Sequence, residues 1–342
     1  MSVPVVAVPS VTKLPASVDG AVVIGGSHGA VYAAYLSAKA GVRAAIHNDA
    51  GIGRDEAGIS GLAWAESHGM AMAAALSGSA RIGDGDDMLK RGVISRANPL
   101  AAACGVKPGQ RVEEAAELLK AAPWPRPKPA PLTEGRTMAG RILCVDSISL
   151  ATLRDRNKVV ASGSHGGVPA GETAAAFGPR LALFNDAGFG MEHAGVAGLL
   201  ILDRAGIPGC AVSTMSARIG DGRSTLLDGF ISEVNEAAYR LGARQGRSAL
   251  AFALAVAERT PEHNRGSAGM AVVNVKSEIA GNVWKIQSKP GDKIEADGEI
   301  MILESMKMEI PVLSPKAGTI REIRVSEGEA IDEGQLVAIL DA

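Results

Sequence analysis

Aromatic residues and cysteines are scarce in this chain of 342 residues. Phe, Trp and Tyr make up 3% of it, whereas 42 residues are glycine, so we expect a core of small aliphatic side chains with close backbone approaches. The cysteines are Cys104, Cys144 and Cys210. Three unclustered cysteines favour reduced thiols in a cytoplasm over a disulfide framework or a zinc site.

An excess of charge, a signal peptide and a long apolar run are also lacking. The net charge is −2 and the pI is near 6.3, so nothing indicates a nucleic-acid partner or an anionic membrane surface. No apolar run reaches the roughly 18–20 residues of a membrane-spanning helix, and the N-terminus has neither the basic nor the apolar region of a signal peptide. We therefore expect a cytoplasmic protein of two or three domains, with no membrane partner.

An internal repeat spans the first two-thirds of the chain. Three polar motifs recur without gaps at an offset of 137 residues (185 minus 48). They are Ser27-His28-Gly29 with Ser164-His165-Gly166, Asn48–Gly51 with Asn185–Gly188, and Ser79–Gly85 with Ser216–Gly222. A match of this length indicates tandem copies, at about residues 4–110 and 141–247.

Short apolar strands alternate with helical stretches in each copy. In the first copy we expect strands at 21–24, 42–47 and 70–76, and helices at 30–40, 56–68 and 87–104. This alternation predicts an αβα unit with a mainly parallel sheet and helices on both faces. The polar motifs then follow successive strands, at the edge of the sheet where α/β proteins bind ligands.

Two connecting segments and a last domain complete the predicted organisation. Residues 111–140 contain the proline-rich run Pro123–Pro131 and are predicted as a linker. The second copy extends to residue 258 through an Ala-rich helix, giving a domain at 141–258. Residues 259–270 are polar and predicted as a flexible tether, and a small β-domain follows at 271–342.

The Ser-His-Gly motifs are the first candidate site. Ser27, His28 and Gly29 join a strand to a helix, and Ser164, His165 and Gly166 repeat the arrangement. Backbone donors at a helix N-terminus form an anion site for a carboxylate or phosphate. The alternative is a glycine turn in which serine caps the helix.

Aspartates and arginines form the second set of candidates. Asp49 and Asp186 could orient a histidine, act as a base or bind a metal, or could instead close Asx turns. Arg81 and Arg218 could clamp a substrate carboxylate through paired hydrogen bonds. The alternative for the two arginines is pairing with the aspartates that follow them in the same motif, Asp84 and Asp221.

Nucleophilic hydrolysis and metal binding are weaker interpretations. Ser27 lies in a Gly-x-Ser-x-Gly pattern that the second copy does not keep, because Ser162 replaces the first glycine. Ser79 or Ser216 could instead meet one of the two motif histidines across the site. His28, Asp49 and Asp84 lack a diagnostic metal spacing, so no metal is predicted.

A second, shorter repeat fills the C-terminal domain. Residues 280–286 resemble 317–323, and 291–294 resemble 328–331. Two strand-rich halves with matching turns predict a small barrel-like sandwich with quasi-twofold symmetry. Lys307 lies between the halves, at the expected tip of a hairpin, flanked by Met306 and Met308.

Residues 271–342 resemble the biotinyl (biotin carboxyl carrier) domain of biotin-dependent carboxylases. The family carries biotin on the lysine of a Met-Lys-Met tripeptide, which corresponds to Lys307; the related lipoyl domains usually carry Asp-Lys-Ala there. The alternative is an ordinary turn lysine beside packing methionines. The resemblance implies covalent biotin, attachment by a biotin protein ligase, and a separate ATP-dependent biotin carboxylase that charges the swinging arm.

Carboxyl transfer is accordingly the predicted function. The repeats would bind a small acceptor, either an anionic one, such as a carboxylate, or an amide, and we expect an oligomer. Two other functions remain open: a non-catalytic carrier with a metabolite- or partner-docking module, and a hydrolase fused to a biotinyl domain.

Overall fold

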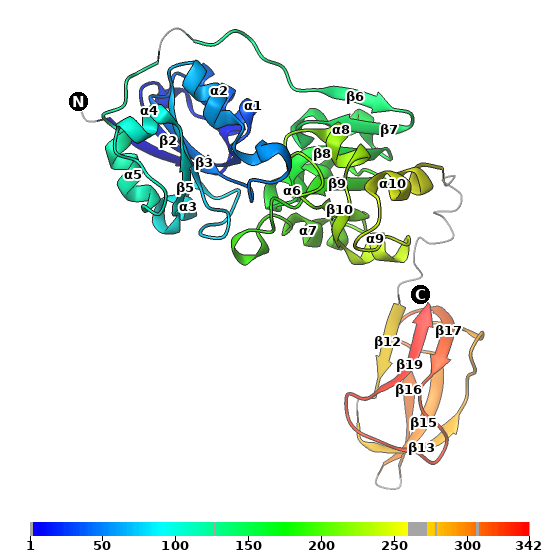
Figure 1. The fold of residues 1–342 in the computed structure, drawn as a ribbon. Coiled ribbons are helices and arrows are strands. Elements are labelled where there is room, and N and C mark those ends of the chain that lie inside the picture. The colour runs from blue at the N-terminus through cyan, green and yellow to red at the C-terminus, as the bar shows by residue number, and fades with distance from the viewer. Residues whose placement is uncertain (1–2, 126–127, 259–271, 278, 306–307, 342) are drawn as a thin grey trace. The chain divides into compact units, whose positions relative to one another are not determined.

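The chain divides into two compact units, residues 1–258 and 259–342. The computed structural model describes residues 3–125, 128–258, 272–277, 279–305 and 308–341 (Figure 1). No helix in these ranges combines the length and the apolar character needed to cross a bilayer.

The first copy is a five-stranded sheet covered by helices. Its strands lie in the order β1-β2-β3-β4-β5, parallel except for β5. The strands are β1 (Val5–Val8), β2 (Val22–His28), β3 (Ala44–Asn48), β4 (Ala71–Ala75) and β5 (Ile94–Ala97). The helices are α1 (Val31–Lys39), α2 (Gly61–Ser67), α3 (Gly85–Arg91), α4 (Pro99–Ala103) and α5 (Val112–Leu119), with 3-10 turns at Val11–Lys13, Ala16–Val18 and Arg54–Ile59.

The second copy repeats this sheet and adds one strand at its edge. The order is β11-β10-β9-β8-β7-β6, with β7 to β10 parallel and both outer strands antiparallel. The strands are β6 (Arg136–Ala139), β7 (Ile142–Val145), β8 (Val159–His165), β9 (Leu181–Asn185), β10 (Gly209–Val212) and β11 (Ile231–Val234). The helices are α6 (Val168–Phe177), α7 (Gly198–Arg204), α8 (Gly222–Leu227), α9 (Glu236–Arg240) and α10 (Ala249–Glu258), with 3-10 turns at Ile148–Leu150, Leu153–Asp155 and Met191–His193.

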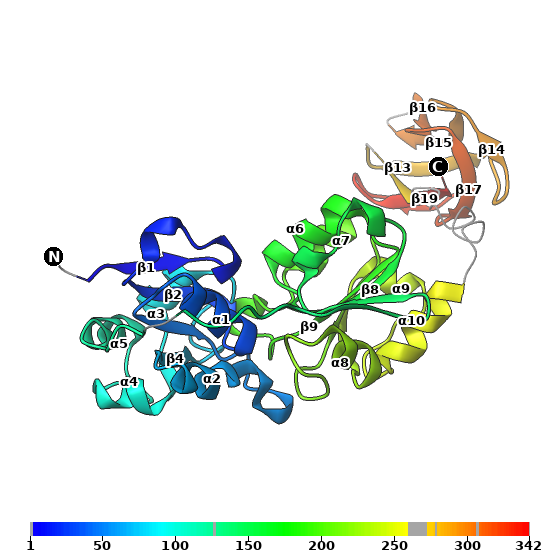
Figure 2. The same ribbon diagram turned by 90° about the horizontal axis from the view of Figure 1, so that it is seen from above.

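Each sheet is buried on both faces, which explains its nearly continuous apolar strands. In the first copy α1 and α2 cover one face, while α3 and α5 cover the other. In the second copy α6 and α7 lie on one face and α8 and α10 on the other (Figure 2). The predicted αβα class with a mainly parallel sheet is therefore confirmed.

Two local predictions differ from the structure. The helix expected at 87–104 is wrong: α3 ends before Gly92, the branched residue Ile94 begins β5 against β4, and Asn98 caps a new helix. The segment 111–140, expected as a linker, contains α5 and β6. α5 buries an apolar face in the first core, and β6 pairs with β7, so tertiary packing overrides the proline-rich composition nearby.

The two copies meet through the loops that follow β3 and β9. Gly51 and Gly188 approach so closely that a Cβ on either would lie 3.2 Å from the other's Cα. Around this contact a small apolar core joins the copies, formed by Ala50, Ala57, Ile82, Ala187 and Ile219. The carboxyl ends of the two sheets therefore face each other.

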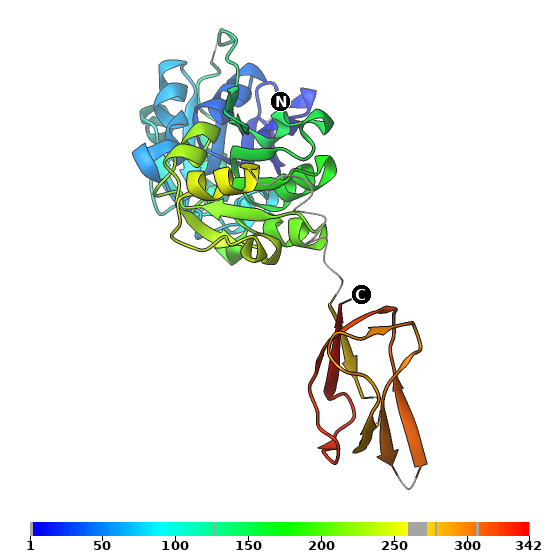
Figure 3. The ribbon, with the colours of Figure 1, turned by 90° about the vertical axis from the view of Figure 1, so that its right-hand side faces the viewer.

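The C-terminal unit is a sandwich of two four-stranded sheets, ordered β12-β19-β17-β14 and β16-β15-β13-β18 (Figure 3). The strands are β12 (Val272–Lys276), β13 (Gly281–Ile286), β14 (Lys293–Ile294), β15 (Glu299–Ser305), β16 (Met308–Leu313), β17 (Gly318–Ile323), β18 (Ala330–Ile331) and β19 (Leu336–Asp341). Its pairings show the expected quasi-twofold symmetry. Gly281 pairs with Ile331, and Gly318 pairs with Ile294 at the equivalent place.

We expect the small core between the copies to contribute to the stability of the N-terminal unit. Ile219 is 3% exposed, and Ile219→Ala leaves a cavity that we expect to lower the free energy of unfolding by about 2–5 kcal/mol. The described helices all lie in the N-terminal unit, so urea unfolding followed by helical circular dichroism reports on it. Leu200→Ala, at a site 65% exposed, is the control and should change stability by less than ~0.5 kcal/mol; equal effects would contradict the interface.

Candidate functional site

A cavity of about 710 Å³ lies between the two copies of the N-terminal unit. It is lined from both, because the strand ends that carry the Ser-His-Gly motifs face each other. The lining includes Ser27, His28, Ser164, His165, Asp55, Arg218 and Asp221, together with Asp146 from the start of the second copy and Glu134 from the segment before it. A volume of this size is typical of small-molecule sites.

The two motif histidines come together in this cavity, as residues related by the internal repeat. His28 ends β2, and its Nδ1 accepts a hydrogen bond from the Ala30 N–H at 3.4 Å. His165 ends β8, and its Nδ1 accepts from the Gly167 N–H at 3.2 Å. A ring nitrogen that accepts is unprotonated, so the neutral ring carries its proton on Nε2.

Both imidazoles are neutral at pH 7. Burial lowers the pKa of His28 to about 4. Burial, with a smaller repulsion from His28, lowers the pKa of His165 to about 3. Neither Nε2 has a hydrogen-bond partner among the described residues, so each offers an uncharged N–H donor to the cavity.

The motif serines hold the adjoining loops in place. Ser27 Oγ accepts from the Val11 N–H at 3.1 Å, and Ser164 Oγ accepts from the Ile148 N–H at 3.0 Å. In the described ranges neither hydroxyl is hydrogen-bonded to an imidazole, as a serine nucleophile would be. Gly29 and Gly166 donate their N–H groups to the Asn48 and Asn185 carbonyls, so these donors are already engaged.

Asp49 and Asp186 close the turns after β3 and β9. Asp49 Oδ1 accepts from the Gly51 and Ser77 N–H groups at 3.0 and 2.9 Å. Asp186 Oδ1 accepts from the Gly188 and Thr214 N–H groups, each at 2.9 Å. Both carboxylates are buried. This is the Asx-turn arrangement that the sequence left open as an alternative, and it supports the junction between the copies.

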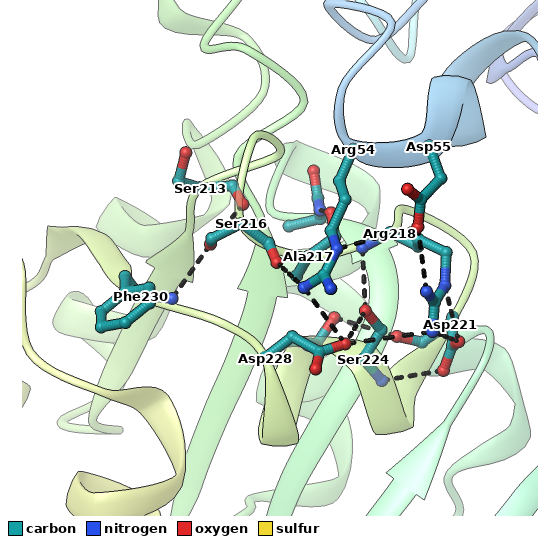
Figure 4. A network of polar contacts seen from close by, with 12 residues as sticks. Arg54, Asp55, Ser213, Ser216, Ala217, Arg218, Asp221, Ser224, Asp228 and Phe230 are labelled. Carbon is teal, nitrogen blue, oxygen red and sulfur yellow. Dashed lines mark hydrogen bonds and ion pairs between the residues drawn. The ribbon is translucent and has the colours of Figure 1, made fainter.

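Arg81 and Arg218 form ion pairs across the junction. Arg81 contacts Glu192 at 2.9 Å, and Arg218 contacts Asp55 at 3.0 Å. Figure 4 shows Arg218 bridging Asp55 of the first copy and Asp221 of its own. Because Asp55 and Glu192 are themselves 137 positions apart, the two bridges are related by the internal repeat. Neither guanidinium is arranged as a free clamp for a substrate carboxylate.

The remaining motif residues cap helices or form hydrogen bonds with the loops that follow the strands. Asp84 and Asp221 cap α3 and α8 by accepting the Asp87 and Ser224 N–H groups at 2.9 and 2.8 Å. Each also contacts the arginine of its own motif, as the sequence allowed. The last two candidates, Ser79 and Ser216, donate to the Leu76 and Ser213 carbonyls and make no hydrogen bond to a histidine. In the described ranges no three His, Cys, Asp or Glu residues are placed to hold a metal.

Two acidic residues that sequence reasoning missed also face the cavity. Asp146 follows β7 and accepts from the Gly135 N–H at 2.6 Å and the Gly222 N–H at 3.2 Å. Its pKa is raised by burial. Burial and the nearby Asp146 raise the pKa of Glu134 to about 7. The repeat gave no signal for either, because Pro9 stands at the position equivalent to Asp146 and Glu134 precedes the second copy.

The neutral histidines predict how stability depends on pH. Their pKa values are lower in the folded protein than the ordinary value of 6.5. The unfolded chain therefore binds protons first, and stability is lost as the pH falls from about 6.5 towards 4. His28→Asn keeps an acceptor for the Ala30 N–H but cannot be protonated there. We expect this variant to lose less stability between pH 7 and pH 4.5, measured by urea unfolding; an unchanged loss would contradict the assignment.

Comparison with known proteins identifies the family of the C-terminal unit. The family model for biotin-requiring enzymes, of the biotin/lipoyl type, matches residues 270–340. The biotin/lipoyl attachment protein of Bacillus subtilis is 43% identical over 65 residues, which cover 19% of this chain and 89% of that protein. A biotinylated protein of Mycobacterium leprae is 40% identical over 67 residues, covering 20% of this chain and 94% of that protein.

A third match is to part of a much larger protein. Urea amidolyase of Saccharomyces cerevisiae is 39% identical over 67 residues, which are 20% of this chain and 4% of that protein. The two short relatives are matched over nearly their whole length, and they confirm the resemblance seen in the sequence. The chain therefore belongs to the biotin/lipoyl attachment family of biotin-requiring enzymes.

Proposed function

We propose that this chain is the biotin carboxyl carrier component of a biotin-dependent carboxylase, whose N-terminal unit binds the acceptor. The observation that carries the proposal is the family match at residues 270–340. Covalent biotin follows from it. Biotin, when bound and carboxylated, supplies the carboxyl group that is transferred.

The hairpin of β15 and β16 supports attachment at Lys307. Ser305 at the end of β15 pairs with Met308 at the start of β16, so only two residues join the paired strands. These are Met306 and Lys307, which lie outside the described residues. The assignment of Lys307 rests on the Met-Lys-Met motif that this position shares with the biotinyl family, and a biotin protein ligase is the expected modifying enzyme.

The cavity between the copies supports a role for the N-terminal unit in acceptor binding. It is a concave site of ligand size with several polar groups converging on it. We propose a separate ATP-dependent biotin carboxylase as the partner that charges the arm, since pyruvate carboxylase of Bacillus subtilis and the human propionyl-CoA carboxylase alpha chain are among the similar proteins. The expected oligomeric state stays a prediction.

The other two functions have less support from the geometry. A hydrolase needs an activated nucleophile, whereas the Ser27 hydroxyl accepts a backbone N–H and contacts Ser10, not an imidazole. A docking module without catalysis does not require two desolvated histidines and a raised carboxyl pKa in one cavity. Acceptor binding uses these features.

Biotinylation at Lys307 is the test of the carrier. After co-expression with a biotin protein ligase, we expect the intact mass of the full chain to rise by one biotin. Lys307→Ala should abolish the rise completely. Lys316→Ala, which removes an exposed lysine of the same unit, is the matched control and should keep it.

Charging by the partner distinguishes a carboxylase component from a chain that is biotinylated for another purpose. With a biotin carboxylase, ATP and labelled bicarbonate, the biotinylated chain should acquire label, and the Lys307→Ala variant should not. An unmodified wild-type chain would refute the carrier assignment, and a biotinylated chain that is never charged would refute its role in carboxylation.

A further inference from the structure

The charges that line the cavity are predominantly negative. Its carboxylate side chains are Asp55, Glu134, Asp146, Glu172 and Asp221, whereas its cationic side chains are Lys13 and Arg218. Arg218 is occupied by Asp55 and Asp221, and Lys13 is exposed to solvent. The other three carboxylates have no cationic partner in the described part of the chain. Glu172 is exposed to solvent, as Lys13 is, so the half-buried Glu134 and Asp146 are the ones that would repel an anionic ligand.

The carboxylates differ in how they are held. Both Asp146 oxygens accept backbone N–H groups, from Gly135 and Gly222, which fixes this side chain. The neighbouring Glu134 has no hydrogen-bond donor among the described residues, although it is partly buried. Tyr32 on α1 of the first copy lines the same cavity, and burial, with a smaller effect of the Glu134 charge, raises its pKa. Glu134 is therefore an unused acceptor that faces the cavity.

The imidazoles supply hydrogen-bond donors, whereas the carboxylates supply acceptors. His28 and His165 each present a neutral Nε2–H, so the cavity contains donors as well as acceptors. An anion would meet the carboxylates, and a cation would meet the positive ends of the N–H dipoles. A neutral amide has a carbonyl that accepts and an N–H group that donates, and it satisfies both sets.

We propose that the acceptor is a neutral amide- or urea-type molecule, whose N–H groups donate to Glu134 and whose carbonyl accepts from His28 or His165. This inference rests on the proposed function, and it selects the amide from the two acceptor classes that the sequence predicted. Asp146 positions the segment that carries Glu134, through its hydrogen bond to Gly135.

A matched pair of probes tests the proposal with the full chain. Malonamide and malonate have the same skeleton, and malonamide is neutral whereas malonate is a dianion. By titration calorimetry at pH 8 we expect malonamide to bind at least about tenfold more tightly than malonate, since an unpaired carboxylate disfavours the anion. Malonate binding as tightly as malonamide, or no binding of malonamide at millimolar concentration, would overturn the proposal.

Glu134→Gln separates hydrogen bonding from general charge. Loss of the charged acceptor should weaken malonamide binding about tenfold and should strengthen malonate binding. Misfolding cannot produce opposite changes for the two probes. Glu172→Gln removes another carboxylate of the same cavity and should leave malonamide affinity within about twofold of wild type; a loss equal to that of Glu134→Gln would overturn the role of Glu134.

The pH dependence and the biotin assay complete the test. Malonamide affinity should rise between about pH 6 and 8, as Glu134 ionises with a pKa of about 7, and the Glu134→Gln variant should show no such rise. A wild-type affinity that is flat with pH would contradict the acceptor role. Failure here leaves biotinylation of Lys307 intact, whereas loss of biotinylation with malonamide still bound would refute the carrier and leave the cavity assignment standing.

Discussion

The contact between Gly51 and Gly188 is the constraint on which the N-terminal unit depends. A Cβ on either glycine would crowd the other loop, and both glycines have a positive φ, of 72° and 69°, which residues with a side chain rarely adopt. Two backbone hydrogen bonds, from Arg54 to the Thr214 carbonyl and from Met191 to the Ser77 carbonyl, each of 2.8 Å, then join the copies symmetrically. Since these loops follow β3 and β9, the contact also turns the carboxyl ends of both sheets towards each other.

The same junction holds backbone in the left-handed region. Ala50 and Ile52 have φ of 50° and 63°, and the equivalent Ala187 and Phe189 have 50° and 61°. Such conformations cost about 1–2 kcal/mol for each residue with a side chain, and they persist only where the surroundings determine them. Here burial of the small core between the copies and the hydrogen bonds across the junction offset that cost, so neither copy is complete without the other.

Elements that depend on local sequence could be predicted, whereas those that depend on contacts between distant residues could not. Local periodicity predicted the alternating strands and helices, and the repeat located the loops at the strand ends. Residues kept in both copies, such as Asp49 and Arg81, serve the symmetrical junction more than the chemistry. Glu134 lies outside the repeat, and only the folded chain brings it to the same cavity as Tyr32 of the first copy. The strand at Ile94 was also missed, because pairing with β4 decides it.

The two sides of the cavity carry different residues, and this difference would favour one orientation of a bound ligand. A ligand between two equivalent copies could bind in two orientations of equal energy, and a transfer reaction that modifies one end of a small acceptor requires a single orientation. Pro9 opposite Asp146, and Glu134 with no counterpart, make the two sides unequal. The two histidines are equivalent donors from the two copies, so under the proposed function the orientation of the acceptor depends on Glu134 and Asp146, which the second copy and its leading segment provide.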